Sequence, residues 1–301
     1  MRRLLVVVVL CAAGCVDDAD PGGPWTELTS LTGPLAPEAG SPPTPRDPPG
    51  CALRIATWNV HFGADPVNLA AQILASHDVA SADVLITQEI EAHPTETGSR
   101  AQRLAEALGM TWVYAPARIE GDGTHGLAIF SRYPLEDAAV RQLPFVDRPI
   151  NPAHRIALAA DVVIGDRRIR VVDVHLETRL SPGDRIRQLH PAVNDVGTRM
   201  IVGGDLNTQP WAWVAGTVPL TSTEAVVGQE HAQIVDDYLA ENGFAGAVPP
   251  STTTMRIPVF GMRLDNLYAR DLSIVASGVE HVDGSDHWPV WFDVTWGACQ
   301  P

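Results

Sequence analysis

The chain has 301 residues, 45% of them hydrophobic, which is enough apolar material for one large domain or two small ones. Its formal net charge of −15 excludes a general electrostatic attraction to nucleic acid, because DNA and RNA are themselves polyanions. A polyanionic substrate would need a local positive site, and a bound metal ion is the simplest way to provide one.

The first residues have the features of an export signal. Two arginines precede the apolar run 4–10, which is shorter than the roughly 20 residues of a membrane-spanning helix, and small residues then lead into Cys15. This arrangement resembles the lipobox of bacterial lipoproteins, in which the cysteine is lipidated, although Ala12 stands where that motif prefers leucine. We expect residues 1–15 to be a signal peptide that anchors the protein to a membrane through lipidated Cys15. Plain secretory cleavage is the alternative, and both place the protein outside the cytoplasm.

Residues 16–50 are rich in proline and show almost no apolar periodicity, so we expect an extended tether. The remaining residues, 51–301, show no internal repeat and no second boundary, which predicts one domain. Cys51 and Cys299 stand near its two ends. In an oxidising compartment such a pair suggests a disulfide, and two unpaired thiols are the alternative.

Strand-like and helical patterns are interleaved along the domain. The hairpin-type turn Gly165-Asp166-Arg167 joins two long strands, and frequent hairpins predict mixed sheets. Helical spacing appears at Val67, Ala70, Ala71 and Leu74, at Ala101, Leu104, Ala105 and Leu108, and over 184–196 and 231–240. The predicted strands are 53–58, 82–87, 111–115, 126–130, 138–143, 156–164, 169–176, 200–202, 264–269, 273–279 and 288–295.

Polar residues of metal- or phosphate-binding types stand at or beside the ends of several predicted strands. Loops at strand ends are where rigid scaffolds present binding and catalytic groups, so these residues are candidates for one site. They are Asn59, Glu89, His175, Asp205, Asn207, Asp265 and the pair Asp286-His287.

The segment 201–210, IVGGDLNTQP, carries two of these candidates. Alternate side chains of an extended segment share a face, so Asp205 and Asn207 are expected to point the same way. Gly203 and Gly204 are expected to keep bulk away, as a phosphate-sized ligand would require. An Asp-x-Asn after a strand is also typical of a turn or a helix cap, and that alternative stays open.

Seven short motifs occur in the order seen in the endonuclease/exonuclease/phosphatase superfamily, which the chain resembles from about residue 51 to 295. The resemblance implies a four-layer α/β sandwich, with two mixed β-sheets packed face to face and helices outside. It also implies divalent-metal-dependent cleavage of phosphoester bonds. The motifs are TWNV at 57–60, QE at 88–89, GLAIFSRYPL at 126–135, VHL at 174–176, GDLN at 204–207, RLD at 263–265 and SDH at 285–287.

The resemblance assigns the metal and the attacking water to particular residues. Glu89 matches the main ligand of Mg²⁺ (or Mn²⁺), with Asn59 beside it and Asp286 helping the metal or the water. Asp205 matches the acid that orients or deprotonates the water, and Asn207 matches its partner at the phosphate.

The resemblance also assigns the phosphate contacts. His287 matches a histidine that contacts a phosphate oxygen, while Asp265 accepts its other ring N–H and favours the imidazolium. His175 matches a second phosphate-contacting histidine, and a buried structural histidine is its alternative. The first and last strands are expected side by side, which would bring Cys51 and Cys299 together.

These observations predict an exported, monomeric, metal-dependent phosphoester hydrolase, most consistent with an endonuclease-like phosphodiesterase. Its substrate would be nucleic acid or a phospholipid headgroup. A lipid phosphohydrolase of the sphingomyelinase or phosphoinositide type is the first alternative, with Trp211 and Trp213 as an apolar lip. The alternative from another class is a non-catalytic binding module on the same fold.

Overall fold

The computed structural model describes residues 22–42, 50–147, 152–194, 199–214, 218–220, 229–257 and 260–297. The predicted signal peptide with Cys15 lies outside these ranges, and so does Cys299, so the lipid anchor and the disulfide stay predictions. Within the described ranges, no helix has the length and apolar character needed to cross a membrane.

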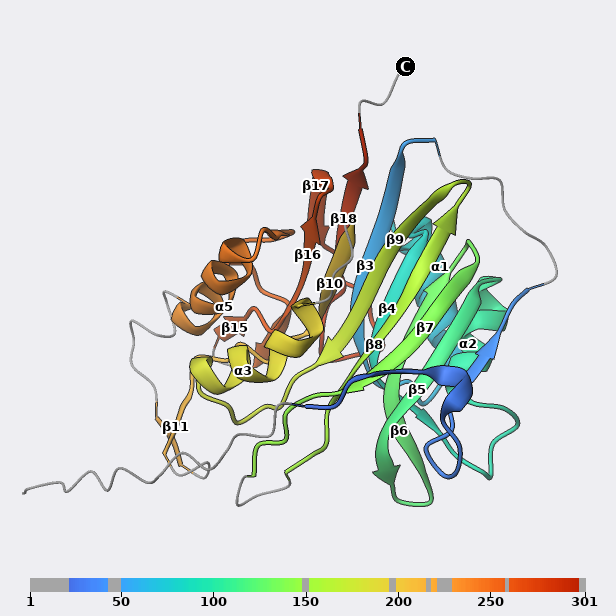
Figure 1. The fold of residues 1–301 in the computed structure, drawn as a ribbon, viewed down its shortest axis with the longest axis horizontal. Coiled ribbons are helices and arrows are strands. Elements are labelled where there is room, and N and C mark those ends of the chain that lie inside the picture. Colours follow the sequence, from blue (N-terminus) through green and yellow to red (C-terminus); the bar gives the residue numbers. More distant parts are fainter. Residues whose placement is uncertain are drawn as a thin grey trace, which may run out of the picture.

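Two seven-stranded sheets pack face to face (Figure 1). We name each after a central strand. The β10 sheet has the order β1 (Trp25–Glu27), β7 (Leu135–Gln142), β8 (Ile156–Ile164), β9 (Arg167–His175), β10 (Met200–Asp205), β16 (Asp265–Arg270) and β13 (Ala245–Gly246). The β4 sheet has the order β17 (Ser273–Val279), β18 (Val290–Thr295), β3 (Ala52–Phe62), β4 (Val84–Ala92), β6 (Gly123–Ser131), β5 (Thr111–Glu120) and β2 (Glu38–Gly40).

Each sheet is mixed, as predicted. β9 and β10 are parallel in one sheet, β3 and β4 are parallel in the other, and the other pairs are antiparallel. The first and last long strands of the β4 sheet, β3 and β18, are direct neighbours. Two further short hairpins, which the sequence patterns did not indicate, are β11 (Ala212–Val214) with β12 (Val218–Leu220) and β14 (Met255–Ile257) with β15 (Phe260–Met262).

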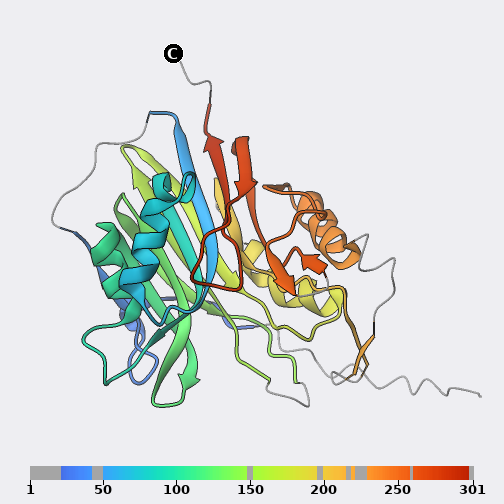
Figure 2. The ribbon, with the colours of Figure 1, turned by 180° about the vertical axis from the view of Figure 1, so that it is seen from behind.

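Helices cover the outer faces of both sheets and complete the four layers (Figures 1 and 2). α1 (Pro66–Ala75) and α2 (Arg100–Leu108) lie on the β4 sheet, and α3 (Pro182–Val193) and α5 (Glu230–Glu241) lie on the β10 sheet. Three apolar clusters match this layering: one fills the space between the sheets, and each of the others lies under one pair of helices. The fold class predicted from the sequence is therefore confirmed.

Local sequence signals explain the starts of three helices. The side chains of Asp65, Ser99 and Ser181 each accept a backbone N–H of the first helical turn. Gly109 ends α2 in the left-handed conformation, with φ 66°.

The apolar stripe predicted for α1 is partly wrong. Leu69, Ala70 and Ile73 are buried, whereas Val67 and Leu74 are exposed. Pro66 also faces inward, so the buried face is rotated by about one position from the predicted one. The other predicted strands and helices are present; the strands predicted at 156–164 and 273–279 have those bounds, and the other boundaries are shifted.

The prediction of a tether over 16–50 is wrong for its central part. β1 pairs with β7 and β2 pairs with β5, so this segment adds an edge strand to each sheet. Leu28, between them, is buried in the cluster between the sheets. Hydrophobic periodicity cannot detect such strands, because each has three residues and pairs only with distant partners.

Candidate active site

Strand register brings three of the predicted site residues side by side. Asp205, at the end of β10, pairs in register with His175 on β9 and with Asp265 on β16. Residues paired directly across neighbouring strands project to the same face of a sheet, so the three side chains meet. All three are buried.

Gly203 and Gly204, before Asp205, allow the neighbouring strands of the sheet to approach closely. A Cβ at Gly204 would lie 2.0 Å from the Val174 carbonyl oxygen, and one at Gly203 would lie 2.5 Å from the Asn266 carbonyl oxygen. Any side chain would therefore collide with the neighbouring strands. The expectation that these glycines make room for a phosphate is not supported, because the atoms they accommodate are backbone atoms.

Asn207 does not follow Asp205 in an extended segment. β10 ends at Asp205, and Asn207 has φ 51°, so the argument from alternating side chains is wrong here. Two hydrogen bonds fix the segment instead. The Asn207 N–H donates to Asp205 Oδ1 at 2.8 Å, and Asn207 Nδ2 donates to the Leu176 carbonyl oxygen at 2.9 Å.

The β4 sheet contributes Asn59 from a regular pair with Gln88, and Glu89 from irregular pairing. Between Asn59 and Phe62 on β3, and between Gln88 and Ile90 on β4, the register shifts. Glu89 is the extra residue on β4 and has φ 61°. A bulge re-aims a side chain that regular pairing would place elsewhere, and strained backbone of this kind concentrates at functional sites.

Contacts between the two sheets join these residues into one cluster. Asn59 Nδ2 donates to Asp205 Oδ2 at 3.0 Å. His175 Nε2 lies 3.5 Å from the same oxygen and 3.9 Å from Glu89 Oε1. Glu89 is only partly buried, and its carboxylate makes no hydrogen bond to the described residues.

The predicted contact between Asp265 and His287 is confirmed. Asp265 Oδ2 lies 2.8 Å from His287 Nδ1 and also accepts the Thr254 hydroxyl at 2.7 Å. On its other side, His287 Nε2 lies 4.0 Å from Asp205 Oδ2. Burial alone would lower the pKa of His287, but the charge and hydrogen bond of Asp265 outweigh it and raise the pKa to about 10.

The two other buried titratable groups shift toward their neutral forms. Burial, followed by repulsion from Asp265, raises the pKa of Asp205 to about 7. Burial, with Arg155 and His125 nearby, holds the pKa of His175 well below its ordinary value. The cluster thus combines a cationic His287, a neutral His175 and a carboxyl group, Asp205, that titrates near neutrality.

Asp286 lies apart from this cluster. Its carboxylate is half-exposed, and its Oδ1 lies 3.4 Å from His61 Nδ1. It belongs to neither of the described groups of close metal-binding side chains, so its role beside the metal stays a prediction.

Three supporting residues were missed by the sequence argument. Thr254 holds Asp265, as described above, and Ser285 accepts the His287 N–H at 3.1 Å while donating to the Asn59 carbonyl oxygen at 2.7 Å. Gln88 donates across the sheets to Asp173 Oδ1 at 2.6 Å. Ser285 and Gln88 stand inside the quoted motifs, which was a usable signal, whereas nothing near Thr254 distinguishes it.

The donor set fits a divalent cation. Ligand atoms of Glu89, His175 and Asp205 lie within 4.8 Å of one another, and so do those of Asp205, Asp265 and His287. Carboxylate and amide oxygens suit Mg²⁺, and a nearby imidazole is compatible with Mn²⁺. Because His287 is engaged with Asp265, the group that contains Glu89 is the better place for a metal.

Arg155 and His154 have contacts of their own outside the cluster. Arg155 Nε lies 3.5 Å from Glu177 Oε2, and His154 stacks on Phe145 at a ring distance of 4.6 Å. His125 is buried, and burial lowers its pKa to about 3.

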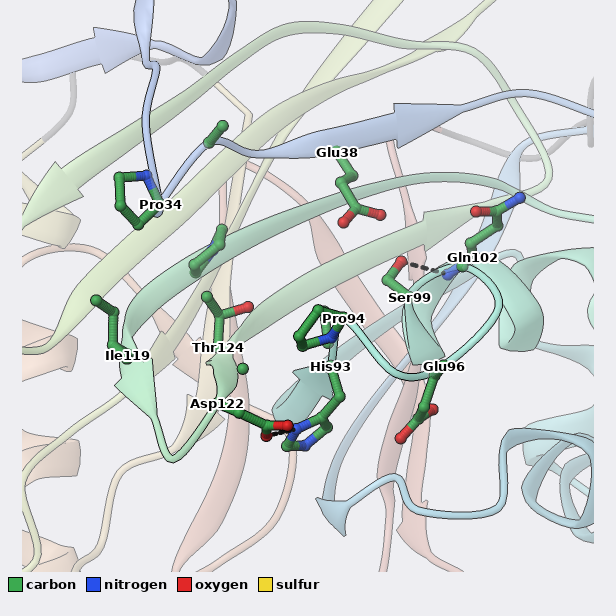
Figure 3. A pocket seen from close by; sticks show the side chains of 15 residues that line it. Pro34, Glu38, His93, Pro94, Glu96, Ser99, Gln102, Ile119, Asp122 and Thr124 are labelled. Carbon is green, nitrogen blue, oxygen red and sulfur yellow. Dashed lines mark hydrogen bonds and ion pairs between the residues drawn. The ribbon is translucent and has the colours of Figure 1, made fainter.

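A separate surface hollow lies beside β2, the start of α2 and the β5–β6 hairpin (Figure 3). Its polar lining includes Glu38, Glu96 and Asp122, with His93 hydrogen-bonded to Asp122. Carboxylates repel a phosphate, and none of the predicted site residues is among those that line it. This hollow is not the phosphoester site.

The sequence from residue 56 to 287 matches the model of the Endonuclease/Exonuclease/phosphatase family. The chain belongs to this family. Members are phosphoesterase-type hydrolases and typically use a divalent metal, which agrees with the donor set above. The matched range contains every residue assigned to the cluster.

Solved structures with the same fold include several members of the family. An endonuclease/exonuclease/phosphatase from Beutenbergia cavernae is 23% identical, with a TM-score of 0.63 over 83% of this chain and 72% of that one. D. rerio TDP2 complexed with single strand DNA product is 17% identical, with a TM-score of 0.54 over 81% and 99%. The Bacteroides thetaiotaomicron mannosyl-6-phosphatase Bt3783 is 16% identical, with a TM-score of 0.56 over 81% and 99%. No curated protein matches the chain in sequence.

Proposed function

We propose that this protein is a divalent-metal-dependent phosphodiesterase of endonuclease-like activity that works outside the cytoplasm. The observation that carries the proposal is a continuous polar connection between the sheets. It runs from Asp265 through His287 to Asp205, and from Asp205 through Asn59 to the strand beside Glu89. A buried carboxyl group with a pKa near 7 is typical of catalytic sites, which favours an enzyme over a binding module.

Glu89, with the amide oxygen of Asn59, would hold the cation. When bound, a divalent cation would supply positive charge to the phosphate oxygens and make the phosphorus more open to attack. The net charge of −15 makes such a local positive centre necessary for a polyanionic substrate.

Asp205 is the proposed general base. Its pKa of about 7 lets it exist as a carboxylate near neutral pH and still accept a proton from the attacking water. The bonds from Asn59 Nδ2 and the Asn207 N–H hold its two oxygens in place. Correct orientation of the base is thus fixed before substrate arrives.

His287 is the proposed donor to a phosphate oxygen. Its Nδ1 proton is committed to Asp265, so the Nε2 proton of the imidazolium is the one available to substrate. Negative charge grows on the phosphate oxygens in the transition state, and a fixed imidazolium stabilises that charge more than it stabilises the ground state.

A nucleic-acid substrate is favoured over a lipid. Trp211 packs on Phe260 at a ring distance of 5.6 Å, and the Arg179 guanidinium lies 5.5 Å from the Trp213 ring. These contacts give both tryptophans a structural use, so a lipid-binding lip is not required. The DNA product in the TDP2 structure shows that this fold can hold single-stranded DNA.

The proposed location rests on the N-terminal sequence. Export would be followed by anchoring through lipidated Cys15, and we propose that the mature enzyme is monomeric. Removal of the first fourteen residues would leave 19 basic and 36 acidic residues, a net charge of −17, so DNA binding should be weak without metal.

A substrate panel tests the proposal. Purified protein with Mg²⁺ is offered plasmid DNA, RNA, sphingomyelin, phosphatidylinositol phosphates and bis(p-nitrophenyl) phosphate, beside the Asp205→Asn variant and the exposed control Asp237→Asn. We expect slow, sequence-independent nicking of DNA and hydrolysis of the aryl diester by the parent and the control. Cleavage of sphingomyelin alone would contradict the nuclease assignment, and inertness toward all five would favour the binding module. Sub-micromolar DNA binding in EDTA would contradict the expected dependence on metal.

A further inference from the structure

Two aromatic residues at the rim of the site have a backbone conformation that their side chains disfavour. His61 has φ 44° and Phe62 has φ 69°, and Gly63 follows with φ 59°. Glycine enters this left-handed region freely, whereas a bulky side chain there is a genuine outlier. Local preference therefore does not explain a phenylalanine at this position.

Specific polar contacts maintain the strained backbone. The Arg100 guanidinium donates to the Phe62 carbonyl oxygen at 2.8 Å, and the His61 N–H donates to Asn59 Oδ1 at 3.1 Å. The same Arg100 nitrogen donates to Glu91 Oε2 at 2.8 Å. This rim is thus tied to Asn59 of the site.

A second layer of residues supports Arg100. His93 Nε2 lies 2.9 Å from Glu91 Oε2, and His93 Nδ1 lies 2.9 Å from Asp122 Oδ1, a contact drawn in Figure 3. Glu96 Oε1 accepts hydrogen bonds from two further nitrogens of Arg100, Nε at 3.0 Å and Nη2 at 2.7 Å. The conformation of Phe62 is therefore imposed from outside the loop.

Packing does not account for the ring of Phe62 either. The residue is 40% exposed and ranks among the exposed large hydrophobic residues of the described chain. Asparagine or glycine would satisfy the backbone with less strain. An aromatic side chain kept at a strained and exposed position points to a contact with something outside the protein.

The ring of Phe62 belongs to a row of four rings beside the metal-binding group. Ring centroids are 4.5 Å apart from His61 to Phe62, 6.3 Å from Phe62 to His125 and 6.3 Å from His125 to His175. His175 Nε2 lies 3.9 Å from Glu89 Oε1. His125 and His175 are buried, so Phe62 and His61 are the exposed rings of this row. Phe62 pairs in register with Ile90, the residue after Glu89, which places the exposed rings beside a phosphate held at Glu89.

We propose that Phe62, together with His61, is the stacking surface for a nucleobase next to the scissile phosphate. The inference rests on the proposed phosphodiesterase function and names the group that the site recognises beyond the phosphate. Every base offers a π-face to an aromatic ring whatever its sequence. A row of flat rings suits such a group better than a flexible acyl chain, which aliphatic side chains would hold equally well.

Two diesters with the same leaving group test the proposal. One is the p-nitrophenyl ester of thymidylate, and the other is methyl p-nitrophenyl phosphate, which has no base. The readout is the ratio of their kcat/KM values with Mg²⁺ in the purified full chain. The variants are Phe62→Leu, which keeps apolar volume without a π-face, and Phe62→Tyr, which keeps the ring. Val275→Ala, at an exposed apolar position on β17, is the control.

The parent is expected to prefer the thymidylate ester, mainly through a lower KM. Phe62→Leu should reduce the preference by about tenfold, while Phe62→Tyr and the control retain it. An unchanged preference in Phe62→Leu would overturn the inference, as would a parent that hydrolyses both esters equally well. A parent that hydrolyses neither ester would contradict the proposed function itself, so the two failures are distinguishable. Should Phe62→Leu fail to fold, loss of the preference in Phe62→Tyr would count against stacking.

Discussion

The two sheets contribute to the site in opposite ways. His175, Asp205 and Asp265 of the β10 sheet are in regular register and buried. On the β4 sheet, Asn59 is likewise buried and in register, but Glu89 and the nearby Phe62 stand at register shifts, in the left-handed conformation, and are partly exposed.

The difference follows from what each set of groups has to do. Proton transfer near neutral pH needs a pKa far from the ordinary value of a carboxyl group, and burial supplies that shift at Asp205. Binding a cation or a substrate needs access, and a bulge turns a side chain out of the regular sheet to give it. Strained residues of this kind cost about 1–3 kcal/mol each and persist because surrounding contacts hold them.

Among the buried residues of the β10 sheet, substitution of Asp205 is expected to have the largest effect on activity. Asp205→Asn keeps the shape and cannot accept a proton, but its single amide oxygen can accept only one of the hydrogen bonds from Asn59 Nδ2 and the Asn207 N–H. We expect kcat for bis(p-nitrophenyl) phosphate to fall by about 10³-fold, with only a small change in thermal stability, because the lost hydrogen bond offsets the removal of a buried charge. Asp237→Asn on the exposed face of α5 is the matched control. Near-parent turnover in Asp205→Asn would remove this residue from the role of base.

The pair formed by Asp265 and His287 is the next test. The raised pKa of His287, about 10, means that the imidazolium persists well above the ordinary value of about 6.5. The pair therefore contributes its full stability below the unfolded pKa and loses it as pH rises through the folded pKa. On the alkaline side, parent activity should fall only as pH approaches that value, whereas the acid limb belongs to Asp205.

Asp265→Asn removes the charge that raises the pKa. The alkaline limb of the kcat/KM profile should move to lower pH, and the maximum should fall by about a hundredfold. Asp271→Asn, in an exposed turn with φ 56°, is the control because asparagine tolerates that conformation. An alkaline limb at the same pH in the variant and the parent would contradict the assigned charge state of His287.

The sequence was informative about which residues meet and uninformative about how they are held. Asp265 with His287, and Asp205 near Asn59, were expected because strand ends and ordered motifs locate them. The Thr254 hydroxyl reaches Asp265 across a turn of the chain, and the left-handed φ of Glu89 occurs where the register of β4 shifts against its neighbouring strands. Hydrophobic periodicity indicates only which face of a strand or helix is buried, so it could not reveal the role of Thr254 or the conformation of Glu89.

The same limit explains the errors in the fold. The edge strand β1 is three residues long and pairs with β7 across more than a hundred positions. Gly203 and Gly204 looked suited to a ligand because sequence alone cannot show that neighbouring strands fill the space. In each case a long-range contact decided the outcome.

A smaller effect is expected where the two sheets touch behind the site. Asp173 on β9 accepts the amide of Gln88 on β4, and burial raises the pKa of Asp173 well above its ordinary value. The folded state therefore binds a proton more tightly than the unfolded state, and stability falls as pH rises above the unfolded pKa.

Asp173→Asn replaces this group by an uncharged one of the same shape. Its Tm should exceed that of the parent by a few degrees at pH 8, and the difference should shrink toward pH 4. Asp166→Asn, in the exposed β8–β9 turn, should show no such dependence. A variant that is less stable than the parent at high pH would show that Asp173 is held as a carboxylate.

A Mg²⁺ titration tests most directly whether a metal ion joins the residues of the two sheets into one active site. The purified protein is stripped with EDTA, and hydrolysis of bis(p-nitrophenyl) phosphate is followed as Mg²⁺ is added back to the parent, to Glu89→Gln and to the exposed control Glu106→Gln. We predict no activity in EDTA, full recovery in the parent and the control, and little recovery in Glu89→Gln at the concentration that saturates the parent. Full activity in excess EDTA, or the same titration curve for Glu89→Gln and the parent, would contradict the account.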